Sequence, residues 1–379
     1  MQTYTAGQWT SESSDDSSAT YIVDIDGGVG SLAGTARVFF ADGRPGTICE
    51  IKIPEQINGQ HRLTVPLYWM PPGQPVMLSR HEILERYPDQ EFPDSAQLLF
   101  ECIDNDHIQV EWTTPIGTGG KATLARSKAG SLSEIESQEM NWDQFKQFAL
   151  GQKPGSLIFR GQPDKFKLRT SFHRTYRKDL IRYVKDDIPV VHRQLTARTQ
   201  HLFDLYNPQQ TGAFYNLLQH HGYPTPLLDW TYSPFVAAFF AYRKRKPKDH
   251  PTRNVRILAF EKEAWVGQFS QLETVNFAQH HFSILEALAI ENNRAIPQQA
   301  VSTLTNVDDI EAYIRTKEAE SNQTFLHAID LQEDCRPEVM VELSLMGITA
   351  GSLFPGLDGA CEELMGRFFH HQVVPRPNN

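Results

Sequence analysis

The sequence has few cysteines, and no two of them are close together. Cys49, Cys102, Cys335 and Cys361 are far apart, and none belongs to a Cys-x-x-Cys pair. This spacing argues against both a disulfide framework and a zinc site. We therefore expect four reduced thiols in a cytoplasmic protein that holds no metal.

Signals for export or membrane insertion are also absent from the sequence. The first residues have neither a basic start nor an apolar run, so no signal peptide is expected. The most apolar run, FVAAFFAY (235–242), is far shorter than the roughly 18 residues that a spanning helix needs. The protein is thus expected to have no membrane partner.

Positive charge is in short supply. The 379 residues carry a formal net charge of −10, which argues against a broad electrostatic hold on nucleic acid or anionic lipid. The basic run RKRKPK (243–248) is interpreted as a solvated helix end, with a phosphate or RNA contact as the alternative.

Helical periodicity is nearly absent from the first part of the chain. Turn signals recur every 8–15 residues there, and an Asp42-Gly43 turn marks one hairpin. The expected strands and hairpins cover residues 21–26, 34–53, 61–69 and 98–114. Residues 1–130 therefore predict a small all-β sandwich or barrel, interpreted as a recognition or regulatory module for a protein partner.

The pattern changes after a Gly/Ser-rich stretch, residues 117–133, which we interpret as a linker. Helical spacing is found at residues 140–150, 211–222, 233–246, 282–293, 338–347 and 358–371. Strands are expected at residues 155–162, 254–260, 294–304 and 323–331. The order predicts a mixed α+β domain over residues 131–379.

Three segments of this second part carry a recognisable pattern. The first is FRGQ (159–162) with LRTSFHR (168–174), the second QHHGYPTPLLDWTYSP (219–234), and the third SLFPGLDG (352–359). Together they resemble the FRG family over roughly residues 138–372. The chain departs from the usual family pattern at Pro226, Ala300 and Gly356.

The order of these segments is also similar to arginine-type ADP-ribosyltransferases. Arg160 leaves a first strand, Thr231-Tyr232-Ser233 opens a helix, and the segment ENNRAIPQQAV (291–301) follows a further strand. The resemblance implies a fold like those enzymes and NAD as the substrate. It also implies a protein or nucleic-acid acceptor and a bacterial toxin or phage-defence effector.

Side-chain chemistry is compatible with a nucleotide in the cleft. The planar fork of Arg160 can hold a pyrophosphate, and Ser233 begins a helix whose free N–H groups favour an anion. His220 can donate a hydrogen bond to a ribose. The proposed cofactor contacts are Phe159, Gly161, Gln162, Thr231, Tyr232, Ser233, Gln298 and Gln299.

Transfer of ADP-ribose also needs a carboxylate that steadies the oxocarbenium-like transition state. The resemblance directs attention to the segment before Pro297, where Glu291 is the nearest carboxylate. Asp229 is the alternative. The predicted catalytic residues are therefore Arg160, His220, Asp229 and Glu291.

Structural interpretations remain open beside these roles. Arg160 can be a buried arginine satisfied by carbonyl groups or by Asp229, and Asp229 can cap the helix that starts at Ser233. His220 can serve a helix C-terminus, and Trp230 is more typical of a core than of a stacking platform.

Three functions compete at this point. The first is NAD-dependent ADP-ribosyl transfer or NAD hydrolysis. The second is a non-catalytic sensor that binds a nucleotide or a phage component in the same cleft. The third is a nuclease, which would need a cluster of metal-binding carboxylates that the sequence spacing does not offer.

Overall fold

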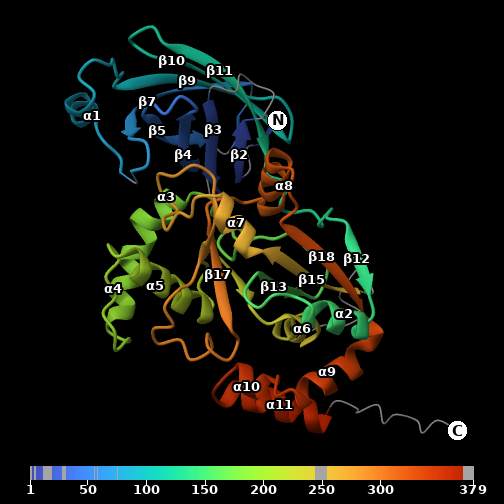
Figure 1. The fold of residues 1–379 in the computed structure, drawn as a ribbon. Coiled ribbons are helices and arrows are strands. Elements are labelled where there is room, and N and C mark those ends of the chain that lie inside the picture. Colours follow the sequence, from blue (N-terminus) through green and yellow to red (C-terminus); the bar gives the residue numbers. More distant parts are fainter. Residues whose placement is uncertain are drawn as a thin grey trace, which may run out of the picture.

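The chain folds into two large sheets that lie one above the other (Figure 1). The computed structural model describes residues 2–3, 6–11, 19–27, 31–54, 56–57, 59–74, 76–243 and 254–369. No helix within these ranges is long and apolar enough to cross a bilayer. Helices and strands occur together, so the molecule is α+β.

The first sheet is antiparallel throughout and belongs to the N-terminal part. Its strand order is β7 (Gln60–Pro66), β9 (Ser95–Cys102), β10 (His107–Thr113), β11 (Gly119–Arg126), β2 (Gly7–Ser11), β3 (Ala19–Asp26), β4 (Ser31–Phe40), β5 (Gly46–Pro54) and β8 (Tyr68–Met70). β7 returns to contact β5, so the sheet curls around an apolar core that includes Trp9, Ile51 and Phe100. A short pair, β1 (Gln2–Thr3) with β6 (Gln56–Ile57), and helix α1 (Arg80–Arg86) complete this part.

The prediction that residues 117–133 form a linker is wrong for the first half of that stretch. Strand β11 occupies Gly119–Arg126 and pairs with both β10 and β2. A Cβ atom on Gly120 would lie 2.4 Å from the ring of Trp112, so glycine is needed for the cross-strand indole. Glycine here allows two strands to pack. Ala122 and Leu124 are buried and lie two residues apart, which is the spacing of a strand with one face in the core. The neighbouring glycines obscured this pattern in the sequence.

The second sheet has seven strands with helices on both faces. Its order is β12 (Ser137–Met140), β18 (Leu326–Gln332), β15 (Asn254–Glu261), β13 (Leu157–Gln162), β14 (Leu227–Thr231), β17 (Ala300–Thr305) and β16 (Phe282–Leu285). Only the β12–β18 pair is parallel among the strands described in this sheet.

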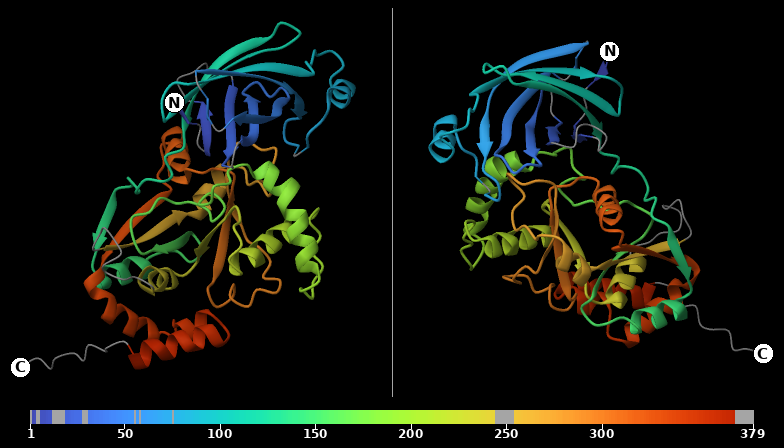
Figure 2. Two further views of the ribbon diagram at one scale, coloured as in Figure 1. Left: turned by 180° about the vertical axis from the view of Figure 1, so that it is seen from behind. Right: turned by 45° about the horizontal axis from the view of Figure 1, so that its top comes forward.

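One face of this sheet packs on α2 (Trp142–Leu150), α6 (Pro234–Arg243) and α9 (Arg336–Leu345), and the other on α7 (Lys262–Gln268) and α8 (Ile310–Ser321). To the side lie α3 (Leu180–Arg182), a π-helical turn (Tyr183–Asp187), α4 (Ile188–Thr196) and α5 (Pro208–His220). A 3-10 turn (Glu333–Cys335) joins β18 to α9. The last helices, α10 (Ala350–Leu353) and α11 (Leu357–Phe369), lie at the C-terminal end of the molecule, below the sheet in the left view of Figure 2.

The helix predicted at residues 282–293 is not formed. The apolar residues of FSIL fit a helix or a strand equally well, and pairing with β17 decides for strand β16, with Ile284 opposite Thr303. After Leu285 the chain continues without regular structure to residue 291. The strand predicted at 294–304 is correspondingly shorter and begins only at Ala300.

The junction between the two sheets is built from buried charge. Asp26, 3% exposed at the end of β3, accepts hydrogen bonds from the backbone N–H groups of Lys178 (2.5 Å) and Asp179 (2.9 Å). The same carboxylate pairs with Arg177 at 2.7 Å and with Arg182 at 3.0 Å. One side chain of the first sheet thus holds the segment 177–182 of the second part in place.

A second contact at the junction runs through Gln8. Its side chain donates to Asp24 at 2.8 Å and to the carbonyl of Asn306 at 2.9 Å, and it accepts from the N–H of Asp308 at 2.9 Å. Asp24 also pairs with the buried Arg37. These bonds join the ends of β2 and β3 to the turn that follows β17.

Candidate functional site

Arg160 lies where the second sheet opens. Strand β13 pairs with β15 along its whole length, but the described pairing with β14 consists of one position, Phe159 opposite Thr231. Beyond that pair the two strands part, and Arg160 reaches across to donate from Nη1 to the carbonyl oxygen of Asp229 at 2.6 Å. The motif arginine therefore stands at a split in the sheet.

The glycine of the same motif has a packing role. A Cβ atom on Gly161 would lie 1.8 Å from the carbonyl oxygen of Ala237 in α6. Only glycine allows α6 to pack this closely on the backbone of β13. Gly161 thus positions α6 and the strand that presents Arg160.

Two further arginines lie in this region, one close to Asp229 and the other close to His220. Asp229 acts electrostatically on Arg174, whose own Nη1 donates to the carbonyl of Arg169 at 2.6 Å. Arg294 donates to the carbonyl of His220 at 3.4 Å. We call Arg160, Arg174, Arg294, His220 and Asp229 the arginine cluster.

Cationic groups outnumber carboxylates in the arginine cluster. Asp229 is exposed, and its carboxylate accepts a hydrogen bond from Gln219 at 2.6 Å. Within the described parts of the chain, none of the three arginines forms an ion pair. The arginine cluster therefore has capacity for an anion.

Burial lowers the pKa of two members of the cluster. It lowers the pKa of Arg160 to about 10, against the opposing field of Asp229 and with a smaller contribution from Arg174. It also lowers the pKa of His220, with Asp229 opposing and Arg294 acting in the same direction. The Nε atom of Arg160 and the Nε2 atom of His220 are buried and have no described hydrogen-bond partner.

A short hydrogen-bonded chain joins two of the sequence segments behind the cluster. The side chain of Gln219 accepts from the hydroxyls of Thr225 and of Ser171, the latter at 3.3 Å. The N–H of Thr225 donates to the Ser171 hydroxyl at 2.9 Å. LRTSFHR and QHHGYPTPLLDW are thereby held together at Asp229.

Sequence reasoning missed Arg174, Arg294 and Gln219 as site residues. Each lies inside a segment that was singled out, but the sequence spacing placed them 55, 65 and 10 residues from Asp229. Their presence as polar residues inside those segments was the available signal.

The predicted anion site at the start of α6 is occupied by capping bonds. The Ser233 hydroxyl accepts from the N–H of Val236 at 3.2 Å, and Thr231 accepts from the N–H of Ser233 at 3.0 Å. Both side chains are buried. Asp229 does not cap the helix, and Trp230 is 3% exposed with its indole N–H donating to Thr303, so it belongs to the core.

Tyr232 points to a different group of polar side chains. Its hydroxyl donates to Glu286 at 2.6 Å and accepts from Lys262, whose ammonium lies 4.8 Å from the tyrosine ring centre. This group lies at the end of the sheet where the strands β14 and β15 both finish.

The remaining predicted cofactor contacts have structural partners. Gln162 donates to the carbonyl of Phe166 at 2.8 Å, and Gln298 donates to the carbonyl of Leu353 at 2.9 Å. Gln299 has a positive φ of 47° and its carbonyl accepts from Tyr232. Phe159 is buried in the core beside α6.

Glu291 does not join the cluster through any described contact. It lies in the loop after β16 with a positive φ of 54°, and its carboxylate accepts from the N–H of His201 at 2.6 Å. The structure thus brings Arg160, His220 and Asp229 together and places Glu291 in a loop contact beside α4.

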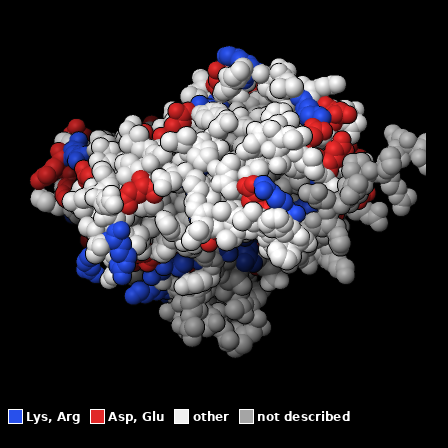
Figure 3. Space-filling model, turned by 90° about the horizontal axis from the view of Figure 1, so that it is seen from below, with Lys and Arg blue, Asp and Glu red and all other residues white. Residues whose placement is uncertain are grey.

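Of the basic run 243–248, Arg243 is described, and it pairs with Glu362 of α11; residues 244–248 lie outside the described ranges. Basic side chains gather along one margin of the lower face (Figure 3). Part of the surface is therefore locally basic, although the net charge of the whole chain is negative.

Among the described residues, no three His, Cys, Asp or Glu side chains are grouped as metal ligands.

Comparison with known proteins identifies one family. Residues 155–250 match the model of the FRG domain, so the chain carries an FRG domain that includes β13, α5, β14 and α6. No curated protein matches the chain. One solved structure, a redesigned β-barrel called mFAP1 bound to DFHBI, is 14% identical over 32% of this chain and 93% of its own, with a TM-score of 0.20, which supports no argument about fold.

Proposed function

We propose that the arginine cluster binds a nucleotide through its pyrophosphate, and that NAD is the ligand. One observation carries this proposal: at the split between β13 and β14, three arginines have no ion-pair partner in the described chain. Arg160 and Arg174 are close to Asp229, and Arg294 is close to His220. Arg160 and Arg294 are partly buried, whereas Arg174 is exposed. A partly buried arginine without a carboxylate is costly unless an anion completes it. A pyrophosphate offers two adjacent anionic groups, which suit the forked guanidinium donors.

The proposed reaction is NAD-dependent ADP-ribosyl transfer or NAD hydrolysis. Arg160 would hold the pyrophosphate, and the unpartnered Nε2 of His220 would meet a ribose oxygen. Asp229 is the carboxylate that belongs to the cluster, so it would steady the positive charge that develops on the ribose as nicotinamide leaves. The proposal therefore moves the catalytic carboxylate from Glu291 to Asp229.

Binding is tested by calorimetric titration of NAD into the wild-type protein and Arg160→Met. The variant should lose at least about tenfold in affinity, because a hydrogen bond to a charged group contributes roughly 1.5–3 kcal/mol. Arg367→Met, which removes an exposed pair with Glu363 on α11, is the matched control and should bind as wild type. Equal NAD affinity in Arg160→Met, or no binding by the folded wild type, would overturn the proposal.

Turnover is tested with NAD labelled in its adenylate part, offered with protein, DNA and RNA acceptors. Label on a macromolecule, or free ADP-ribose, is expected with the wild type and not with Asp229→Asn, whose NAD affinity should be kept or increased. Growth arrest of bacteria by the wild type but not by Arg160→Met would support the proposed role in toxicity or phage defence.

The second candidate is a sensor that binds the nucleotide without turnover. The position of Glu291 favours it, because the carboxylate implied by the family resemblance contacts His201 instead of the cluster. Thermal stabilisation by NAD without any consumed NAD would select the sensor.

A further inference from the structure

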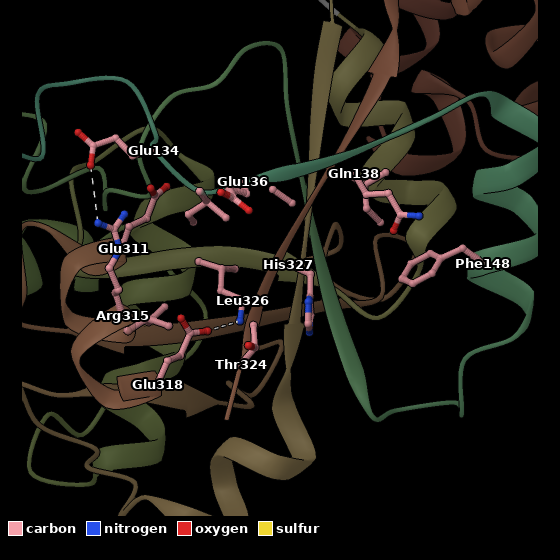
Figure 4. A pocket seen from close by; sticks show the side chains of 14 residues that line it. Glu134, Glu136, Gln138, Phe148, Glu311, Arg315, Glu318, Thr324, Leu326 and His327 are labelled. Carbon is pink, nitrogen blue, oxygen red and sulfur yellow. Dashed lines mark hydrogen bonds and ion pairs between the residues drawn. The ribbon is translucent and has the colours of Figure 1, made fainter. Parts of the chain in front are cut away.

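A cavity of about 530 Å³ lies at the β12 edge of the second sheet, with lining residues from both of its faces. Helix α8, the segment 134–138 that enters β12, and strand β18 form its walls (Figure 4). Its apolar lining comes from Ile135, Phe148, Ile314, Ala328 and Ile329. The volume is that of a small-molecule site, and none of the sequence motifs described above contributes to it.

Carboxylates dominate the polar lining of this cavity. Four glutamates, Glu134, Glu136, Glu311 and Glu318, stand against Arg315 and His327. In Figure 4 the carboxylates of Glu134, Glu136 and Glu311 lie on one side of the cavity, and Phe148 and His327 lie on the other. The cavity thus has an acidic side and an aromatic side.

Little of this negative charge is neutralised by neighbours. Arg315 reaches Glu134 at 3.7 Å, and both side chains are more than half exposed. Glu318 accepts from the N–H groups of Phe325 and Leu326 at 2.6 and 2.9 Å. The acidic side therefore keeps an excess of carboxylate charge.

Glu311 gives the cavity a buried polar group that lacks a partner. The residue is 2% exposed, and its Oε1 atom accepts from the N–H of Leu168 at 2.9 Å. Its Oε2 atom has no hydrogen-bond partner among the described residues, although Ser133 is nearby. Burial raises the pKa of this carboxyl, with Ser133 and the Leu168 N–H opposing. A buried carboxylate oxygen without a donor is destabilising until a ligand supplies one.

We propose that this cavity binds a small organic cation, an amidinium, guanidinium or primary amine carried on an apolar body. The cationic head donates to Oε2 of Glu311 beside Glu136, and the apolar body packs against Phe148 and Ile314. The carboxylates of the described chain do not converge as metal ligands do, so their spread suits an extended organic cation better than a metal ion.

Benzamidine and its neutral isostere benzamide test the proposal by calorimetric titration into the full chain. Benzamidine should bind at least tenfold more tightly than benzamide, because only the amidinium is a charged donor. Equal affinities, or no binding of benzamidine up to about 10 mM, would overturn the proposal.

Two variants locate the binding. Glu311→Gln keeps an acceptor for the Leu168 N–H but removes the charge, and it should weaken benzamidine at least tenfold while leaving benzamide within twofold. Glu136→Gln, which changes an exposed side chain without a described partner, should weaken benzamidine two- to threefold. Glu320→Gln, on the same helix and paired with Lys317, is the control and should bind as wild type. Unchanged benzamidine affinity in both Glu311→Gln and Glu136→Gln would place the cation elsewhere and sink the proposal.

Discussion

The junction between the sheets and the arginine cluster both combine arginines with carboxylates, but they differ in charge balance. At the junction, buried carboxylates meet arginines in direct contact: Asp26 with Arg177 and Arg182, and Asp308 with Arg169 at 2.6 Å. In the arginine cluster, Arg160 and Arg174 are close to Asp229 and Arg294 is close to His220, but none of the three forms an ion pair within the described residues.

The difference separates stability from binding. A paired buried charge contributes to the fold chiefly because removing one partner leaves the other uncompensated. An arginine without a carboxylate partner contributes little to the stability of the fold, and its guanidinium N–H groups remain available to a ligand. Changes at the junction should therefore alter unfolding, and changes in the cluster should alter binding.

The largest effect is expected from Asp26→Ala. It leaves Arg177, Arg182 and two backbone N–H groups of the junction without their acceptor, and should cost ~3–5 kcal/mol of unfolding free energy in urea titrations. Arg160→Met should change the same quantity by less than ~1 kcal/mol, because it removes a single hydrogen bond to a carbonyl. If Arg160→Met lowered the unfolding free energy as much as Asp26→Ala does, the two regions would not differ in their contribution to stability.

A smaller loss of stability is expected from Gly161→Ala, inside the FRG motif itself. The added Cβ meets the carbonyl of Ala237, so α6 or β13 must shift, at roughly 1–3 kcal/mol. Gly267→Ala, at a helical position where a Cβ meets nothing within 4 Å, is the control and should not destabilise. Equal thermal midpoints for the two variants would contradict the close packing of α6 on β13.

The junction should also make stability depend on pH. Burial lowers the pKa of His173 to about 3 and that of His281 to about 4, from 6.5. Between pH 6.5 and 4 the unfolded chain binds these protons and the folded chain does not, so both histidines make stability fall as pH falls. Asp179 acts in the opposite direction, because burial raises its pKa from 3.8 to about 7 and the folded state gains its proton first.

Asp179→Asn keeps the acceptor that caps Ile181 and Arg182 but removes this opposing group. Its unfolding free energy should fall more steeply than that of the wild type between pH 6.5 and 5, by up to about 1.4 kcal/mol per pH unit. Parallel pH profiles from urea titrations at each pH would show that Asp179 is ionised in the folded protein.

Local patterns predicted much of the secondary structure. The turn at Asp42-Gly43, the strand 155–162 and the helix before Gly222 follow from residues that are neighbours in sequence. The prediction failed at residues 282–293, where pairing with β17 outweighed helical spacing, and at Gly119–Arg126, where glycines serve the packing of Trp112. Both failures arise because the deciding partner is remote in the chain.

For the site, the sequence by itself determined the motif residues: Arg160 at a strand end with Gly161 beside it, and Asp229 shortly before the helix that starts at Ser233. That Asp229 lies in a strand, β14, came from the structure. Only the tertiary structure decided that β13 and β14 part after one pair, that Arg174 lies close to Asp229 and Arg294 to His220, and that Glu291 contacts His201. The physical reason is that the local sequence pattern determines strands, turns and helix caps over a few neighbouring residues. The charge balance of a site depends instead on which distant segments lie side by side in the folded chain.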